Sequence, residues 1–159
     1  MILSRFVAVR LADPKSITIS DHGQNTLADS HSPLLVAQRR GWAVSYERGC
    51  NVCDQQPKGY PNFPCQVKDS DADRSNFTRA VAAAKAADIA VLFLGNDQTT
   101  EAENFDRYSL ALPGAQQALL EAVAAVQPNI ILVLQNGGPI AGAHSRLQTL
   151  LRWVVSPHQ

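Results

Sequence analysis

Two uninterrupted apolar runs constrain the fold more than any other feature of this sequence. Residues 89–94 read IAVLFL, and residues 130–134 read IILVL. A strand that is apolar at every position has both of its faces covered, which is the usual situation in parallel sheets. A helix-like segment precedes each run, so helix and strand alternate along the chain. This order predicts a mostly parallel sheet with helices on both faces, in other words a three-layer α/β/α sandwich.

The helices before these runs are indicated by caps and apolar stripes. The first is expected from about Ser75 to Ala87, with Ser75 as its N-cap. The second is expected over residues 114–126, and Pro113 opens it. The apolar stripes that face the sheet are expected to contain Phe77, Val81 and Ala84 in the first helix and Leu119, Val123 and Val126 in the second.

Both ends of the chain are harder to place, and we divide the chain into three parts. Residues 1–31 form an N-terminal segment with a candidate first strand, residues 32–141 form the sandwich domain, and residues 142–159 form a divergent C-terminal end. Further strands are expected at residues 6–9, 17–20, 43–46 and 153–155. Further helices are expected at 33–40, which Gly41 would end, and at 142–151. A long loop is expected at 50–74.

The charge balance argues against two classes of partner. Lys and Arg number 14, Asp and Glu number 14, and the formal net charge is zero. Neither nucleic acid nor a membrane surface is therefore an expected partner. No apolar stretch approaches the ~20 residues of a membrane span. Arg5 and Arg10 interrupt the first apolar segment, so no secretory signal is recognised. The location of the protein stays unknown, and an extracellular or periplasmic location is considered for the full-length enzyme.

Three cysteines, Cys50, Cys53 and Cys65, lie within one segment. The odd number argues against a framework held only by disulfides, although one pair can bridge and leave one thiol over. The Cys50–Cys53 spacing also suits a metal or a redox pair. A second such pair and a nearby histidine, which a zinc site needs, are both missing, so no metal is expected.

The loop after the first apolar run carries four acids and an arginine. These residues are Asp97, Glu101, Glu103, Asp106 and Arg107. A carboxylic acid with a raised pKa, placed beside a glycosidic oxygen, can protonate the leaving group and then act as a base toward water. In an extended segment Glu101 and Glu103 would point to opposite sides, so one of them would face a given cleft. Asp106 and Arg107 are expected to form an ion pair that fixes the loop. The alternative is a solvated acidic loop.

The segment QNGGP, residues 135–139, follows the second apolar run. Its backbone N–H groups can hold an anion, although it matches neither the phosphate loop nor the dinucleotide pattern. The alternative is a turn that requires glycine. The other candidate groups give weaker signals. The four histidines lack metal-ligand spacing: His22, His31, His144 and His158. No serine nucleophile elbow is present. Trp42 and Trp153 are expected in core or interface packing rather than in sugar stacking.

The acidic loop also resembles a known family. LGNDQTTEAENFDRYSLALPG, residues 94–114, resembles the pattern G-x-D-Q-T-x-E-A-E-x-x-D-R-x-x-L-x-L-P-G of the glycoside hydrolase family 3 C-terminal domain. The β-xylosidase and β-glucosidase branch is the most similar. VSYERGC at 44–50, AAAKAADIAVLFLG at 82–95 and ILVLQNGGPIA at 131–141 follow the same family in the same order. The resemblance covers about residues 32–141 and implies a flavodoxin-like sandwich.

The resemblance implies a retaining β-glycosidase that acts on terminal β-linked sugars. In that family an aspartate nucleophile lies on a preceding (β/α)8 barrel domain, and the second domain supplies the acid/base glutamate from an E-x-x-D-R loop. The match selects Glu103, with Glu101 as the second choice, and makes Asp97, Asp106 and Arg107 supporting residues. No metal and no organic cofactor are implied. The expected partners are a β-linked oligosaccharide or glycoside and an upstream barrel domain.

Departures from the family pattern limit what the chain is expected to do alone. The barrel is absent, residues 10–31 do not follow the family, and no G-Y-P-G-like loop follows Ala141. We therefore expect a fragment that is incomplete at both ends and catalytically silent by itself. The alternatives are a non-catalytic, flavodoxin-like ligand-binding or interaction module, and a remnant that does not fold. The sequence does not distinguish xylose, glucose and arabinose as the sugar.

Overall fold

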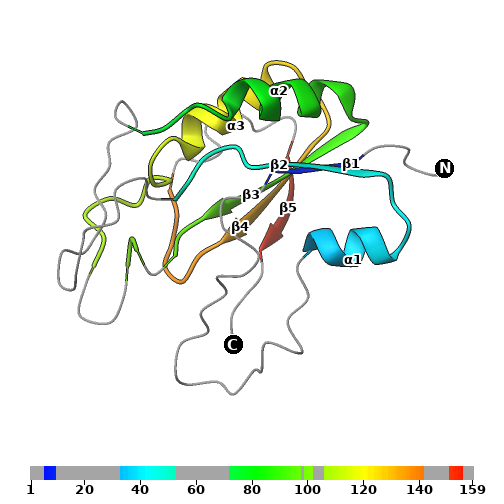
Figure 1. Cartoon of the computed structure of the whole chain (residues 1–159). Helices are drawn as coiled ribbons and strands as arrows, with labels where there is room; N and C mark the ends of the chain where they lie inside the picture. The colour runs from blue at the N-terminus through cyan, green and yellow to red at the C-terminus, as the bar shows by residue number, and fades with distance from the viewer. Residues whose placement is uncertain are drawn as a thin grey trace.

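A parallel sheet forms the centre of the computed structural model, which describes residues 6–9, 33–52, 72–97, 99–101, 106–141 and 151–155 (Figure 1). The sheet has 5 strands in the order β2-β1-β3-β4-β5, and every neighbouring pair is parallel. This is the flavodoxin-like strand order. The strands are β1 (Phe6–Val9), β2 (Val44–Glu47), β3 (Ile89–Gly95), β4 (Ile130–Gln135) and β5 (Leu151–Val155).

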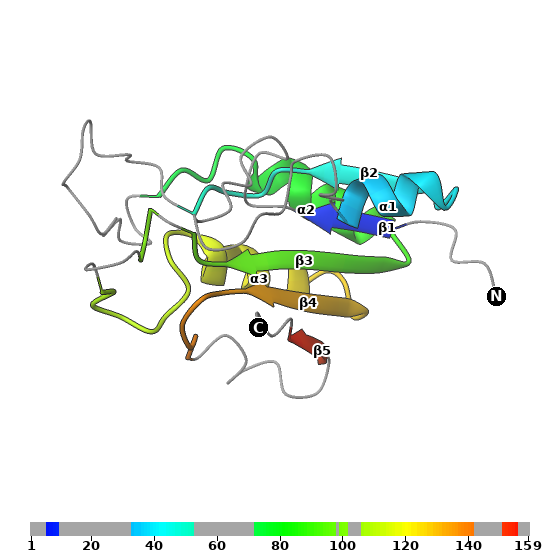
Figure 2. The same ribbon diagram turned by 90° about the horizontal axis from the view of Figure 1, so that it is seen from below.

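Helices cover both faces of this sheet. Two of them, α2 (Phe77–Ala86) and α3 (Gln116–Ala124), lie side by side on one face, and α1 (Pro33–Arg39) lies on the other (Figures 1 and 2). The expected three-layer α/β/α class is therefore confirmed. None of the helices in the described part of the chain is long and apolar enough to cross a membrane.

The core lies between β3, β4 and the pair α2 and α3. Leu92 and Leu132 from the strands and Leu119 from α3 are completely buried. Burying one such leucine stabilises the fold by roughly 1.5–3 kcal/mol relative to leaving it exposed. In α2 the fully buried positions are Ala80 and Ala84, whose small side chains let the helix pack closely on the sheet. Phe77 and Val81, which belong to the expected stripe, are only partly buried.

Helix α2 begins later than the sequence predicts. Ser75 is not its N-cap, because α2 starts at Phe77 and the capping position is Asn76, which makes no side-chain cap hydrogen bond. Asp73 instead accepts the backbone N–H of Ser75 at 2.8 Å and its hydroxyl at 3.0 Å. These two hydrogen bonds lower the pKa of the Asp73 carboxyl. A local Asx-type turn has replaced the expected cap.

The carboxyl end of β3 is fixed by Gly95 and Gln116. Gly95 has φ +148°, and a Cβ there would lie 1.8 Å from the carbonyl oxygen of Gln135 in β4. Among the described residues, strand β1 pairs with β3 only as far as Leu92, and none of them pairs with Gly95 as a strand on that side. The buried Gln116 amide takes that place, accepting the Gly95 N–H and donating to its carbonyl, both at 2.8 Å. The loop after β3 therefore leaves from a rigid point.

Both candidate end strands are part of the sheet. The expected strand at 6–9 is β1, and β5 extends the expected strand at 153–155 to begin at Leu151. The expected strand at 43–46 is observed one residue later, and α1 stops before Gly41, which has φ +71°. The expected strand at 17–20 and most of the loop at 50–74 lie outside the described residues. Of the expected helix at 142–151, residues 142–150 also lie outside them, and Leu151 begins β5 instead. The division at residues 31 and 141 stays a prediction.

Candidate active site at the carboxyl edge of the sheet

Two loops meet where β3 and β4 end. The loop after β3, here called the acid loop (residues 96–112), lies at the carboxyl edge beside the loop after β4, here called the β4 turn (residues 136–141) (Figure 2). The two strands are in register up to Gly95 and Gln135, and the N–H of Asn96 donates to the carbonyl of Gln135 at 2.9 Å. Ligands of open α/β sheets bind at this edge.

The first part of the acid loop is a tight turn organised by Asp97. The Asp97 carboxylate accepts the backbone N–H of Thr99 at 2.8 Å and also accepts its hydroxyl. The buried Thr100 hydroxyl donates to the Asp97 carbonyl at 2.9 Å, and the N–H of Glu101 bonds to the same oxygen at 3.3 Å. Asp97 thus forms the turn of this loop, and its supporting role in catalysis stays a prediction.

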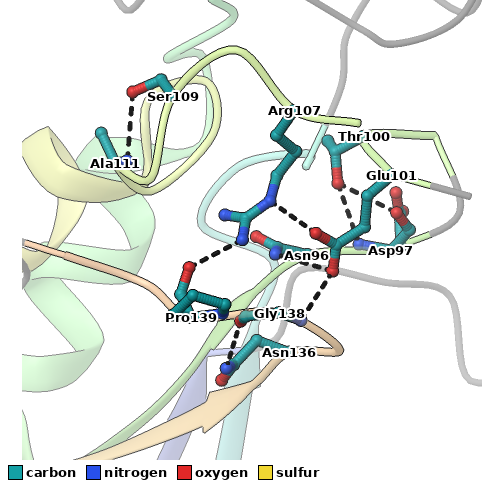
Figure 3. Close-up of polar contacts among 10 residues, drawn as sticks. All are labelled: Asn96, Asp97, Thr100, Glu101, Arg107, Ser109, Ala111, Asn136, Gly138 and Pro139. Atoms are coloured by element: carbon teal, nitrogen blue, oxygen red, sulfur yellow. Dashed lines mark hydrogen bonds and ion pairs between the residues drawn. The ribbon is translucent and has the colours of Figure 1, made fainter. Parts of the chain in front are cut away.

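Glu101 points toward the β4 turn, and its carboxylate has three donors (Figure 3). Its Oε1 accepts the side-chain amide of Asn96 and the backbone N–H of Gly138, each at 3.1 Å. Its Oε2 pairs with Nε of Arg107 at 2.5 Å. Two donors from the acid loop and one from the β4 turn therefore converge on this side chain.

The surroundings of Glu101 favour its charged form. Partial burial by itself would raise the pKa of this carboxyl, because desolvation disfavours the anion. The hydrogen bonds from Asn96 and Gly138 and the positive charge of Arg107 outweigh that effect and lower the pKa below its ordinary value. Glu101 is therefore a carboxylate at neutral pH, and it is poorly suited to donate a proton.

Arg107 is the second half of this arrangement. Its side chain is only 8% exposed, and its Nη2 donates to the carbonyl of Pro139 at 2.7 Å. The expected Asp106–Arg107 ion pair is wrong, since Arg107 pairs with Glu101 and Asp106 is exposed.

The glycines of the β4 turn make room for this pair. A Cβ on Gly137 would lie 3.1 Å from Oε1 of Glu101. A Cβ on Gly138 would lie 3.0 Å from Nη2 of Arg107 and 3.2 Å from Oε2 of Glu101. The turn does accept an anion, as its composition suggested, but the anion is the carboxylate of Glu101. Asn136 closes the turn from within by donating to the Gly138 carbonyl at 2.7 Å.

Glu103, the first choice for the acid/base residue, lies outside the described residues, as do residues 102, 104 and 105. Its neighbours along the chain, Glu101 and Arg107, are described and paired with each other. Sequence reasoning missed Asn96 and Gln116 as parts of the site. The signal that could have found them is an amide side chain directly after a buried strand and another at the start of the following helix.

The remaining candidates contribute little to this edge. His22, His31, His144 and His158, together with Cys53 and Cys65, lie outside the described residues, and Cys50 is buried in the core. Among the residues that the structure describes, no cluster of His, Cys, Asp or Glu could hold a metal. Trp42 is 50% exposed rather than packed in the core, and the Arg40 guanidinium lies 5.9 Å from its ring. The side chain of Trp153 is not described.

The fold and the site together define a class of protein domain. It is a flavodoxin-like sandwich with an acidic loop at the carboxyl edge of its sheet. The model of the glycosyl hydrolase family 3 C-terminal domain matches residues 9–154, and the chain belongs to this family. The resemblance inferred from the acid loop is thereby confirmed, and it extends to both ends of the sheet.

Individual relatives agree with this assignment. An exo-α-(1→6)-L-arabinopyranosidase of Bifidobacterium longum is 46% identical over 72 residues, which are 45% of this chain and 10% of that protein. A probable β-D-xylosidase of Arabidopsis thaliana is 54% identical over 63 residues, 39% of this chain and 8% of that protein. The crystal structure of a family 3 β-glucosidase of Bifidobacterium adolescentis superposes with a TM-score of 0.61 at 30% identity, covering 87% of this chain and 18% of that one. The chain thus spans about a tenth of the length of these curated relatives.

Proposed function

We propose that this chain is the acid/base-bearing domain of a retaining β-glycosidase and that Glu103 is the acid/base residue. Glycosidase chemistry is the chemistry of its family, and the relatives are named for it. The nucleophilic aspartate belongs, in this proposal, to a separate (β/α)8 barrel domain. The 159-residue chain is therefore inactive alone.

The observation that carries the proposal is the state of Glu101. The acid loop offers two glutamates, two residues apart, and Glu101 is engaged by Arg107, Asn96 and Gly138. A proton donor must be protonated before the reaction, and these three donors favour the anion instead. Glu103 is the other glutamate of the acid loop and the one that matches the E-x-x-D-R motif, so we assign the role to it.

The proposed reaction has two steps. First, the carboxylic acid of Glu103 gives its proton to the glycosidic oxygen while the C1–O bond breaks and the barrel aspartate bonds to C1. Second, the Glu103 carboxylate takes a proton from water while that water displaces the aspartate, which restores both carboxyl groups and retains the configuration. A retaining enzyme needs its two carboxyl groups about 5–5.5 Å apart, which the acid loop can provide only when the barrel docks at this edge.

The substrate class follows from the relatives only in outline. Their names include an arabinopyranosidase, a xylosidase and a glucosidase, so terminal pentoses and hexoses are both compatible with this type of domain. We propose a terminal pentoside or hexoside as the substrate. The barrel domain would supply most contacts that select the sugar.

The test joins the chain to the barrel domain of a family relative. Hydrolysis of a dinitrophenyl β-glycoside, which needs little protonation, is compared with hydrolysis of the phenyl β-glycoside, which needs more. The measured quantity is kcat/KM, which reports formation of the glycosyl-enzyme, because the loss of Glu103 as the base slows the second step for both substrates. Glu103→Gln should retain kcat/KM on the first substrate and lose about 10²–10⁴-fold on the second, the usual contribution of general acid catalysis. Full activity of this variant on the phenyl glycoside would exclude Glu103.

A second experiment distinguishes the catalytic proposal from a non-catalytic role in which the sandwich domain only binds a ligand. Titration calorimetry of the isolated chain against simple sugars and nucleotides should show no nucleotide binding, because the Gly138 N–H already donates to Glu101. Nucleotide binding at the β4 turn would favour a non-catalytic ligand-binding module instead.

A further inference from the structure

Three contacts join the acid loop to the β4 turn along one seam. Gly138 donates its N–H to Glu101 at 3.1 Å, Arg107 donates to the carbonyl of Pro139 at 2.7 Å, and the N–H of Ala141 donates to the carbonyl of Leu110 at 2.7 Å. None of these contacts belongs to a helix or to the sheet. The first two depend on the side chains of Glu101 and Arg107.

The Glu101–Arg107 pair also closes the acid loop on itself. The Arg107 Nε and the Glu101 Oε2 are 2.5 Å apart, although six positions separate the two residues in sequence (Figure 3). The pair therefore ties two described positions of the acid loop, 101 and 107, to each other and to the β4 turn. Bringing two points of a chain together costs conformational entropy, which the ion pair and the hydrogen bonds offset.

We propose that Glu101 and Arg107 are a positioning pair, which docks the acid loop on the β4 turn and so fixes both ends of the segment that carries the acid/base residue. This inference rests on the proposed function for its catalytic meaning, but its structural part can be tested without it. In this proposal the Glu101 side chain stays a carboxylate and takes no part in proton transfer.

The charge and geometry of the pair explain why both residue types are needed. The planar guanidinium of Arg107 reaches Glu101 with Nε and Pro139 with Nη2, so one side chain contacts both loops. A lysine would carry the charge but has no second donor held in that fixed orientation. At position 101, glutamine would keep an oxygen for the Gly138 N–H but would lose the charge that faces Arg107.

The experiment measures amide hydrogen exchange in the isolated 159-residue chain, because exchange reports local opening directly. Glu101→Gln should speed exchange at least tenfold in residues 99–101, 106–110 and 136–141 and leave β3 and β4 unchanged. The control is Glu47→Gln, since Glu47 also pairs with an arginine, Arg79, at 2.6 Å and is similarly exposed (22% against 23% for Glu101). The control should change none of these segments.

A second variant keeps the test decisive if Glu101→Gln lowers the folded fraction. Arg107→Lys retains the positive charge and should speed exchange in the same segments by a smaller factor. Unchanged exchange of the acid loop and the β4 turn in both variants would overturn the inference. Equal acceleration throughout the sheet would also overturn it, because the pair would then support the whole fold rather than the position of one loop.

A catalytic readout distinguishes positioning from a merely structural role. In the chain joined to a family barrel, Glu101→Gln should lower kcat/KM, which reports the first step, about tenfold more on the phenyl glycoside than on the dinitrophenyl glycoside. A merely structural role would lower both by the same factor and would contradict the inference. A failure of the proposed function gives a different pattern, in which Glu103→Gln itself hydrolyses the phenyl glycoside normally while the exchange result for Glu101→Gln still stands.

Discussion

The described part of the chain shows two Glu–Arg pairs whose N–O distances are nearly equal but whose surroundings differ strongly. Glu47 at the end of β2 pairs with Arg79 of α2 at 2.6 Å, and Glu101 of the acid loop pairs with Arg107 at 2.5 Å. The glutamates are similarly exposed, but the Arg79 side chain is 68% exposed and that of Arg107 only 8%. Glu101 also accepts two further hydrogen bonds, from Asn96 and Gly138.

This difference separates an ion pair on a surface from one that organises a site. An exposed pair contributes little, because water and salt screen both charges and long side chains lose entropy when they pair. A largely buried guanidinium is stabilising only when its charge is compensated, so Arg107 depends on Glu101 as much as the loop depends on both. The lesson is that the partners and burial of a pair, rather than its distance, indicate which pair matters for function.

The largest difference is expected when each arginine is removed. Arg107→Met leaves the partly buried Glu101 without its cation and should destabilise the fold by about 2–3 kcal/mol, near the lower end for a broken buried pair. Arg79→Met should cost about 0.5 kcal/mol or less. Urea unfolding followed by circular dichroism measures both, and equal losses would show that burial of Arg107 has no energetic consequence.

Neutralising the acids should give a smaller contrast. Glu101→Gln keeps an acceptor for Gly138 but weakens two charge-assisted bonds, which should cost about 1–2 kcal/mol. Glu47→Gln should change the unfolding free energy by about 0.5 kcal/mol or less. The same urea experiment applies, and a double-mutant cycle with Arg107→Met isolates the coupling; additive losses at positions 101 and 107 would contradict a direct pair.

The pH dependence of the Glu101→Gln effect provides a sharper test. Because the folded-state pKa of Glu101 is lowered, its stabilising contribution is complete above the unfolded value of about 4.3 and is lost as the pH falls through the lower folded value. The stability difference between the original chain and Glu101→Gln should therefore be constant from pH 7 to about 5 and should shrink below about 4. A difference that grows toward low pH would mean that the pKa is raised.

Salt should give the smallest effect and should act mainly on the surface pair. At about 1 M NaCl the screening length falls to about 3 Å, which weakens exposed pairs more than buried ones. The small cost of Arg79→Met should disappear, while most of the cost of Arg107→Met should remain. Melting curves at low and high salt measure this, and equal salt sensitivity would contradict the contrast between the two pairs.

Much of the fold could be predicted because its signals are local. The apolar runs that became β3 and β4 need no knowledge of distant residues, since strands covered on both faces are apolar throughout. The start of α2 could not be predicted equally well, because Ser75 can cap a helix or bond to Asp73, and the sequence does not decide between them. Local rules thus predict elements better than their boundaries.

The acid loop could be predicted as the site, but its internal pairing could not. Asp106 seemed the natural partner of Arg107 because it is adjacent, whereas the observed partner, Glu101, is six positions away. Gly138 is 37 positions from Glu101, so no sequence spacing connects them. The contact exists because two parallel strands end at the same edge, which is a property of the sheet rather than of either loop.

The central claim is that Asn96, Gly138 and Arg107 keep Glu101 ionised, which leaves Glu103 as the proton donor of the loop. The most direct test is a carbon-13 NMR titration of the Glu101 carboxyl in the 159-residue chain. We expect a pKa below the ordinary value of about 4.3, the same result in the Glu103→Gln variant, and a return toward the ordinary value in Arg107→Met. A Glu101 pKa at or above the ordinary value in the original chain would contradict it.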